Sequence, residues 1–190
     1  MKTKISHEMP SGGAIRVARA ALVAGVCTLF SGLALAAAPL LHTTKSVDVD
    51  ASASKVWGIV KDFSGINNWH PAVAKDEIVE GTDNTAGAVR HLTLKDGGTI
   101  QEKLLAYNAA GRSMKYEILE SVLPVSHYSS TISVKSTGKG KSTITWSGHY
   151  KRKNTGDNPG DKENDQAASD TIAAVYQGGL DNVKKLAEGH

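Results

Sequence analysis

The side chains most able to do chemistry in this sequence are an arginine and a glutamate on two adjacent predicted strands. Polar and apolar residues alternate along residues 88–95 and 99–107, and this period of two is typical of half-buried strands. The alternation places Arg90 on the apolar face of the first strand and Glu102 on the corresponding face of the second. Both charges are therefore predicted to point toward the interior.

The turn between these strands determines how the two charges meet. A hairpin loop of three residues at 96–98 would set Leu92 opposite Glu102. Arg90 would then be the diagonal neighbour of Glu102, within reach of two long side chains. A buried charge is costly unless it is paired, and an adjacent arginine would lower the pKa of the glutamate. Two interpretations stay open: a structural ion pair, or a charge that meets a polar group of a ligand.

The same alternation continues through the following strands and makes the predicted inner face mainly aliphatic and aromatic. Its further members are Leu94, Ile100, Leu104, Ala106, Met114, Tyr116, Ile118, Tyr128, Ile132, Val134, Ile144 and Trp146. Aromatic walls with a few polar groups are typical of apolar ligand pockets, although the same residues would also make an ordinary core. The predicted pocket residues are Trp69, Arg90, Leu92, Glu102, Leu104, Tyr116, Ile118, Tyr128, Trp146 and Tyr176.

A histidine between a tryptophan and a proline is a further candidate for chemistry. Trp69-His70-Pro71 follows a short predicted helix, where it could shape the mouth of a pocket. His70 could carry a proton near neutral pH, or it could be a solvated turn residue. With Glu102 and Tyr116 it completes the acid–base candidates, but none is assigned as catalytic.

Motifs for other chemistries are not found in the sequence. The histidines lack metal-ligand spacing and the chain has one cysteine, Cys27, so we expect no metal site. There is no nucleophile elbow, phosphate loop or dinucleotide fingerprint, so we also expect no cofactor.

Elements that would position these residues follow from periodicity and turn signals. The order predicts an α+β architecture: a curved antiparallel sheet of about seven strands wraps around a long C-terminal helix, and two short helices follow the first strand. Predicted helices span 53–62, 66–69 and 167–186; predicted strands span 43–49, 77–80, 88–95, 99–107, 112–121, 126–136 and 142–151.

The first 36 residues have the three parts of a secretion signal: a basic start, an apolar run and the small-residue site Ala34-Leu35-Ala36. A permanent membrane anchor is the alternative, but no basic cluster follows the run. We therefore predict removal of 1–36, a single domain at 37–190 and a periplasmic or secreted location. Of 22 basic and 19 acidic residues, four and one lie in 1–36, which leaves 18 of each sign and no excess charge for nucleic acid.

Several short motifs together resemble the START/Bet v 1-like superfamily of helix-grip proteins, which includes polyketide cyclases, dehydrases and lipid transport proteins; the resemblance implies the α+β helix-grip fold. They lie at 51–57, 68–71, 98–104, 123–128, 146–148 and 176–180. The resemblance covers about residues 45–188. It implies an apolar cavity under the C-terminal helix. More loosely, the chain resembles the periplasmic MxaD-type accessory proteins of bacterial methanol oxidation, which implies a dehydrogenase or its cytochrome as partner.

These observations favour a non-enzymatic periplasmic protein that binds a small hydrophobic molecule, a partner protein or both. The alternatives are a cyclase- or dehydratase-like enzyme, or a lipid carrier. A further alternative is a protein that acts through its outer surface, which a cavity filled by its own side chains would favour.

Overall fold

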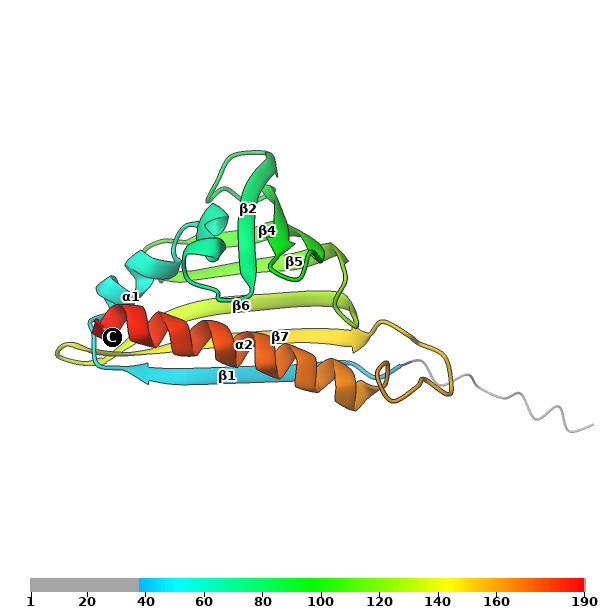
Figure 1. Cartoon of the computed structure of the whole chain (residues 1–190). Helices are drawn as coiled ribbons and strands as arrows, with labels where there is room; N and C mark the ends of the chain where they lie inside the picture. The colour runs from blue at the N-terminus through cyan, green and yellow to red at the C-terminus, as the bar shows by residue number, and fades with distance from the viewer. Residues whose placement is uncertain (1–37, 190) are drawn as a thin grey trace, which may run out of the picture. The chain divides into compact units, whose positions relative to one another are not determined.

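A computed structural model describes residues 38–189 as one antiparallel sheet and a long helix across its concave face (Figure 1). The strand order is β1-β7-β6-β5-β4-β3-β2. The predicted α+β helix-grip fold is confirmed. The strands are β1 (Leu41–Val49), β2 (Val73–Glu80), β3 (Val89–Leu94), β4 (Thr99–Asn108), β5 (Ser113–Ser121), β6 (Val125–Gly138) and β7 (Lys141–Arg152).

The helix α2 (Asp165–Glu188) begins and ends at residues suited to those positions. The Asn164 side chain accepts a hydrogen bond from the N–H of Ala167 at 2.8 Å, and Gly189 ends the helix in the left-handed region at φ 84°. One face of α2 is buried, and each aliphatic side chain there contributes roughly 1.5–3 kcal/mol. The buried residues are Ala168, Ile172, Tyr176, Gly179, Leu180, Val183 and Ala187.

Two short helices follow β1, as predicted, but the first ends sooner. Helix α1 (Ala53–Val60) is capped by Ser52, and the 3₁₀ helix η1 (Phe63–Asn68) starts after an extended residue, Asp62. The loop before β3 explains the break. Asn84 accepts a hydrogen bond from the N–H of Phe63, and Asp83 accepts one from Ser64. These contacts take the place of hydrogen bonds that a continuous helix would have made. They come from a distant loop, so a local sequence pattern does not predict them.

The predicted register of the β3–β4 hairpin is wrong by two residues. Arg90 lies directly opposite Glu102, and Leu92 lies opposite Ile100. The connection is wider than three residues because the N–H of Leu94 bonds to the carbonyl of Gly98 across the turn. A shift of two keeps every side chain on its predicted face.

A β-bulge changes which residue of β4 faces inward near its end. The β4–β5 register shifts between Leu104 and Ala106, and Ala106 is exposed rather than on the inner face. Tyr107 takes the inward position, where its ring lies 5.9 Å from that of Trp57. The prediction for Ala106 is therefore wrong, because strict alternation does not survive a bulge.

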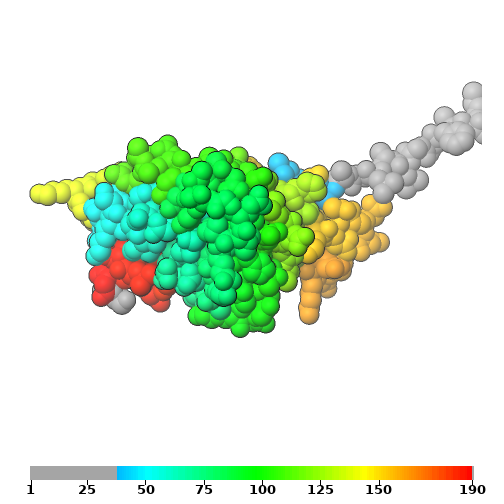
Figure 2. Space-filling view, turned by 90° about the horizontal axis from the view of Figure 1, so that it is seen from above, coloured from blue at the N-terminus to red at the C-terminus, as the bar shows by residue number. Residues whose placement is uncertain are grey.

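The long β6–β7 hairpin forms the far end of the domain, and its tip (yellow) projects from the surface in Figure 2. Within residues 38–189, no helix is long and apolar enough to cross a bilayer. The predicted secretion signal at 1–36 lies outside the described residues.

Candidate functional site

A charged cluster is buried inside the sheet where β2, β3 and β4 meet η1. Arg90 is 2% exposed and donates from Nε and Nη2 to Oε2 of Glu102, at 2.8 and 2.5 Å. Its Nη1 donates to the carbonyl oxygen of Phe63 and lies 3.6 Å from a carboxylate oxygen of Asp76. The guanidinium also stacks over the Phe63 ring at 4.2 Å. One arginine therefore serves two buried carboxylates.

The predicted lowering of the Glu102 pKa is wrong in direction. Burial raises the pKa of Glu102, and Arg90 opposes this rise without reversing it. The single positive charge of Arg90 is shared with Asp76, so it cannot fully stabilise both ionised carboxylates. A carboxyl group with a raised pKa retains its proton at a higher pH than usual.

Sequence reasoning missed the third member of the cluster. The side chain of Asp76 on β2 is fully buried, and burial raises its pKa to about 6, against the opposing charge of Arg90. Its Oδ2 accepts a hydrogen bond from the N–H of Ile66, while Oδ1 has no partner among the described residues. The predicted strand began only at Glu77. A longer strand with the same alternation would have placed Asp76 on the inner face.

Facing this cluster, an aromatic group joins the sheet to α2. The rings of Trp146 and Tyr176 stack at 4.4 Å, and Trp69 lies edge-on to Trp146 at 5.7 Å. Tyr128 and Tyr176 share a hydrogen bond between their hydroxyls at 2.7 Å. Burial raises the pKa of both tyrosines, so the pair is neutral.

Two glycines allow this close approach. A Cβ at Gly179 would lie 2.7 Å from His70 and 3.0 Å from Trp146, so α2 can rest on these rings only without a side chain there. A Cβ at Gly148 on β7 would collide with the Tyr176 hydroxyl. Both glycines lie in motifs noted in the sequence, and this close packing explains why each position requires glycine.

An apolar cavity of about 60 Å³ separates the charged cluster from the aromatic group. Side chains from η1, the sheet and α2 line it: Ile66, His70, Ala72, Val73, Leu92, Leu94, Ile100, Glu102, Ile118, Leu123, Tyr128, Trp146, Ile172 and Val175. The carboxyl group of Glu102 and the rings of His70, Tyr128 and Trp146 therefore border an otherwise aliphatic space. Such a site can hold an apolar molecule and present it with one polar contact.

The sequence model of the family described as "Polyketide cyclase / dehydrase and lipid transport" matches residues 41–188. The chain belongs to this family. It is 31% identical to the solved structure of XoxI from Bacillus cereus, over 77% of this chain and 94% of that one, with a TM-score of 0.67. An uncharacterised Bacillus thuringiensis protein gives the same identity and TM-score, over 77% of this chain and 98% of that one.

A more distant member of the fold is the ZhuI aromatase/cyclase from a Streptomyces species. It is 22% identical over 79% of this chain and 94% of that one, with a TM-score of 0.64, which shows a shared fold alone. No curated protein matches the chain significantly.

The ten predicted pocket residues occupy two places in this family's fold. Leu92, Glu102, Ile118, Tyr128 and Trp146 line the cavity. The other five are buried around it: Trp69, Arg90, Leu104, Tyr116 and Tyr176. Six further lining residues were not predicted as pocket residues, because lining by a helix or by the ends of strands depends on how these elements dock: Ile66, Ala72, Val73, Leu123, Ile172 and Val175.

His70 lies inside the protein rather than at a solvated mouth. It is 5% exposed, accepts a hydrogen bond at Nδ1 from the N–H of Ala72, and has Nε2 3.0 Å from the carbonyl oxygen of Val175. Burial lowers its pKa, so the ring is neutral and donates from Nε2. Through these contacts His70 connects the end of η1 to α2 at the cavity wall.

The hydroxyl of Tyr116 and Nε1 of Trp69 are buried without hydrogen-bond partners among the described residues. Buried polar groups are usually paired, so each such atom calls for a partner that residues 38–189 do not supply. Residues 38–189 contain no group of three or more histidine, cysteine or carboxylate side chains able to hold a metal ion.

Proposed function

We propose that this protein is a binding module that takes up a small apolar molecule between its sheet and α2. The observation that carries the proposal is the cavity, whose mainly apolar wall includes one carboxyl group, that of Glu102. A binding role explains why large neighbours such as Trp146 and Tyr128 leave it open.

The cavity must expand to accept a ligand. Its volume of about 60 Å³ lies well below the ~300 Å³ at the low end of small-molecule sites. The side chains that bound it on the sheet side, Ile118 and Tyr128, would have to move apart. The family description, which includes lipid transport, agrees with an apolar occupant.

A neutral fluorescent probe tests this function. N-phenyl-1-naphthylamine should bind the wild-type protein with enhanced emission because it enters an apolar environment. Val175→Phe places a larger side chain at the cavity wall and should weaken binding about tenfold or more. Val79→Phe, at a position 55% exposed on β2, is the matched control and should bind as the wild type does. Equal binding by both variants, or none by the folded wild type, would refute the proposal.

An enzymatic role is the second candidate, and Glu102 is the observation that favours it. Its carboxyl borders the cavity and has a raised pKa, as a general acid requires. Both hydrogen bonds from Arg90 to Glu102 end at Oε2, and within residues 38–189 no hydrogen bond reaches Oε1 of Glu102. Turnover of a polyketone that is lost in Glu102→Gln, with probe binding retained, would establish this role.

The accessory role implied by the MxaD-type resemblance belongs to the same proposal. Export of the mature domain would place it beside periplasmic dehydrogenases and their cytochromes. Sequencing of the amino terminus after expression would identify cleavage near Ala36. Co-purification of a named dehydrogenase from the periplasm, abolished by surface substitutions and not by Val175→Phe, would support a partner surface distinct from the cavity.

A further inference from the structure

The sheet is split between β5 and β6. Their ladder runs from Ser113 opposite Ser133 to Glu117 opposite Ser129, and no pairing of these two strands is present beyond that rung in residues 38–189. Past it, β5 continues paired to β4 as far as Ser121, and β6 continues paired to β7. Each strand therefore keeps its outer neighbour while the two separate from each other.

Two bulges at the same level account for the split. On β5 the register with β4 shifts between Gln101 and Glu102, which leaves Leu119 as an extra residue. On β6 the register with β7 shifts between Ser126 and Ser129, where His127 has φ 51°. A bulge bends its strand and increases its twist, and bulges are frequent beside functional sites. Here the two bulges bend β5 and β6 away from each other.

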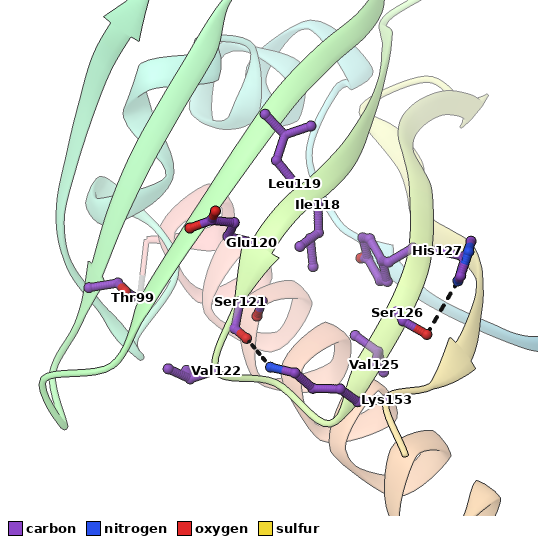
Figure 3. Close-up of a pocket in the computed structure, with 11 residues that line it drawn as sticks. Thr99, Ile118, Leu119, Glu120, Ser121, Val122, Val125, Ser126, His127 and Lys153 are labelled. Atoms are coloured by element: carbon purple, nitrogen blue, oxygen red, sulfur yellow. Dashed lines mark hydrogen bonds between the residues drawn. The ribbon is translucent and has the colours of Figure 1, made fainter. Parts of the chain in front are cut away.

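The split opens into a surface groove of about 530 Å³ (Figure 3). This volume is within the range of small-molecule sites, unlike that of the inner cavity. Lys153 reaches across the groove and donates from Nζ to the carbonyl oxygen of Ser121 at 2.7 Å. Leu119 and Val122 beside it are 46% and 56% exposed, which gives the groove an apolar rim.

The groove and the inner cavity are separated by two side chains. Ile118 of β5 and Tyr128 of β6 line both spaces. They are also the first residues beyond the last paired rung of the ladder. The ring of Tyr128 packs against Tyr116 and Tyr150, and its hydroxyl is hydrogen-bonded to that of Tyr176 on α2. This hydrogen bond can be exchanged for one with water or ligand.

We propose that this groove is the entrance to the cavity and the site for the polar end of an elongated amphipathic ligand with a carboxylate head. The apolar body passes between Ile118 and Tyr128 into the cavity, and the carboxylate stays outside on the Lys153 ammonium. Glu120 also lines the groove, from β5. Because its carboxylate repels a carboxylate head group, the head group lies on the Lys153 side of the groove. This inference rests on the proposed uptake of an apolar molecule and adds its route and its head group.

The head group is tested with cis-parinaric acid and its methyl ester, which differ only in the charge of one end. Lys153→Gln should weaken binding of the acid about fivefold and leave binding of the ester unchanged, because an exposed ion pair is worth up to about 1 kcal/mol. Lys151→Gln, two residues away on β7 and outside the groove, is the matched control. An equal effect on acid and ester would overturn the carboxylate assignment.

The route is tested by obstruction, in a Cys27→Ser background so that one thiol is present. Glu120→Cys at the groove and Lys115→Cys, exposed on the same strand, are each labelled with a bulky polyethylene glycol maleimide. Stopped-flow uptake and release of N-phenyl-1-naphthylamine should both slow about tenfold or more for the label at 120 alone, with the dissociation constant unchanged.

The outcomes separate the two proposals. If the folded wild type and both labelled variants bind no probe, the proposed function itself fails. If all bind and the two labels give equal rates, the function stands and the entrance lies elsewhere. Ile118→Ala, which removes half of the barrier, should speed both uptake and release, and slower exchange in this variant would overturn the gate.

Discussion

The two halves of the interior are stabilised by different physics. On the β2–β4 side, Arg90, Glu102 and Asp76 form a compact group of buried charges in which two acids share one base. On the α2 side, Trp146 and Tyr176 stack closely because Gly179 and Gly148 carry no side chain. The first half depends on charge balance, and the second depends on shape. The cavity lies where the two halves meet. Packing aromatic rings against the charged group would disturb its charge balance, and placing charges among the rings would disturb their packing.

The largest effect should come from unbalancing the charged half. Glu102→Leu leaves Arg90, which is 2% exposed, with Asp76 as its remaining carboxylate. Loss of one partner of a buried ion pair costs about 3–5 kcal/mol, so we expect the free energy of unfolding in urea to fall by that amount. The double variant Arg90→Met with Glu102→Leu should recover much of the loss. A single variant as stable as the wild type would show that Asp76 alone suffices.

The next effect is a fall in stability with rising pH, which the charged half produces. The pKa of Asp76 is raised from 3.8 to about 6 in the folded state. Between these values the folded state binds more protons than the unfolded state, so the stabilisation present below pH 4 is lost as pH rises through 6. The loss is on the order of 2–3 kcal/mol. Urea unfolding at pH 4.5 and 7.5 should show it in the wild type.

Asp76→Asn is the matched control for that titration because it keeps the oxygen that accepts from Ile66. His70 contributes the opposite slope, since its lowered pKa makes stability fall as pH drops through its ordinary range. The quantity to compare is therefore the difference in the free energy of unfolding between wild type and Asp76→Asn at each pH. An identical pH profile in the two proteins would mean that Asp76 is ionised throughout.

The smallest effect separates two adjacent glycines of α2. Gly179→Ala would press a methyl group against His70 and Trp146 and should destabilise the protein by about 1–3 kcal/mol. Gly178→Ala meets nothing within 4 Å and should stabilise it by about 0.5–1 kcal/mol through helix propensity. Thermal unfolding at pH 7.5 would measure both. Equal shifts would remove the argument that shape complementarity holds the aromatic half together.

Much of the fold follows from local patterns along the chain. Period-two alternation identified the inner faces of β3 to β7, because successive side chains of a strand point to opposite sides. The apolar stripe from Ile172 to Leu186 identified most of the buried face of α2 in the same way, with a period of 3.6, although Leu186 itself is 45% exposed. These features depend on neighbours in sequence, so a single chain is enough to read them.

Other features required the tertiary structure. Arg90 meets Glu102 directly rather than diagonally because the turn is wider than its glycines suggested, and Ala106 faces outward because β4 carries a bulge. Asp76 reaches the charged cluster because β2 is the edge strand of the sheet and pairs with β3. The size of the cavity and the split beside Tyr128 likewise depend on how distant elements dock. The sequence by itself determined most of the side chains that face inward; their partners, and the space left between them, were decided by contacts between residues far apart in the chain.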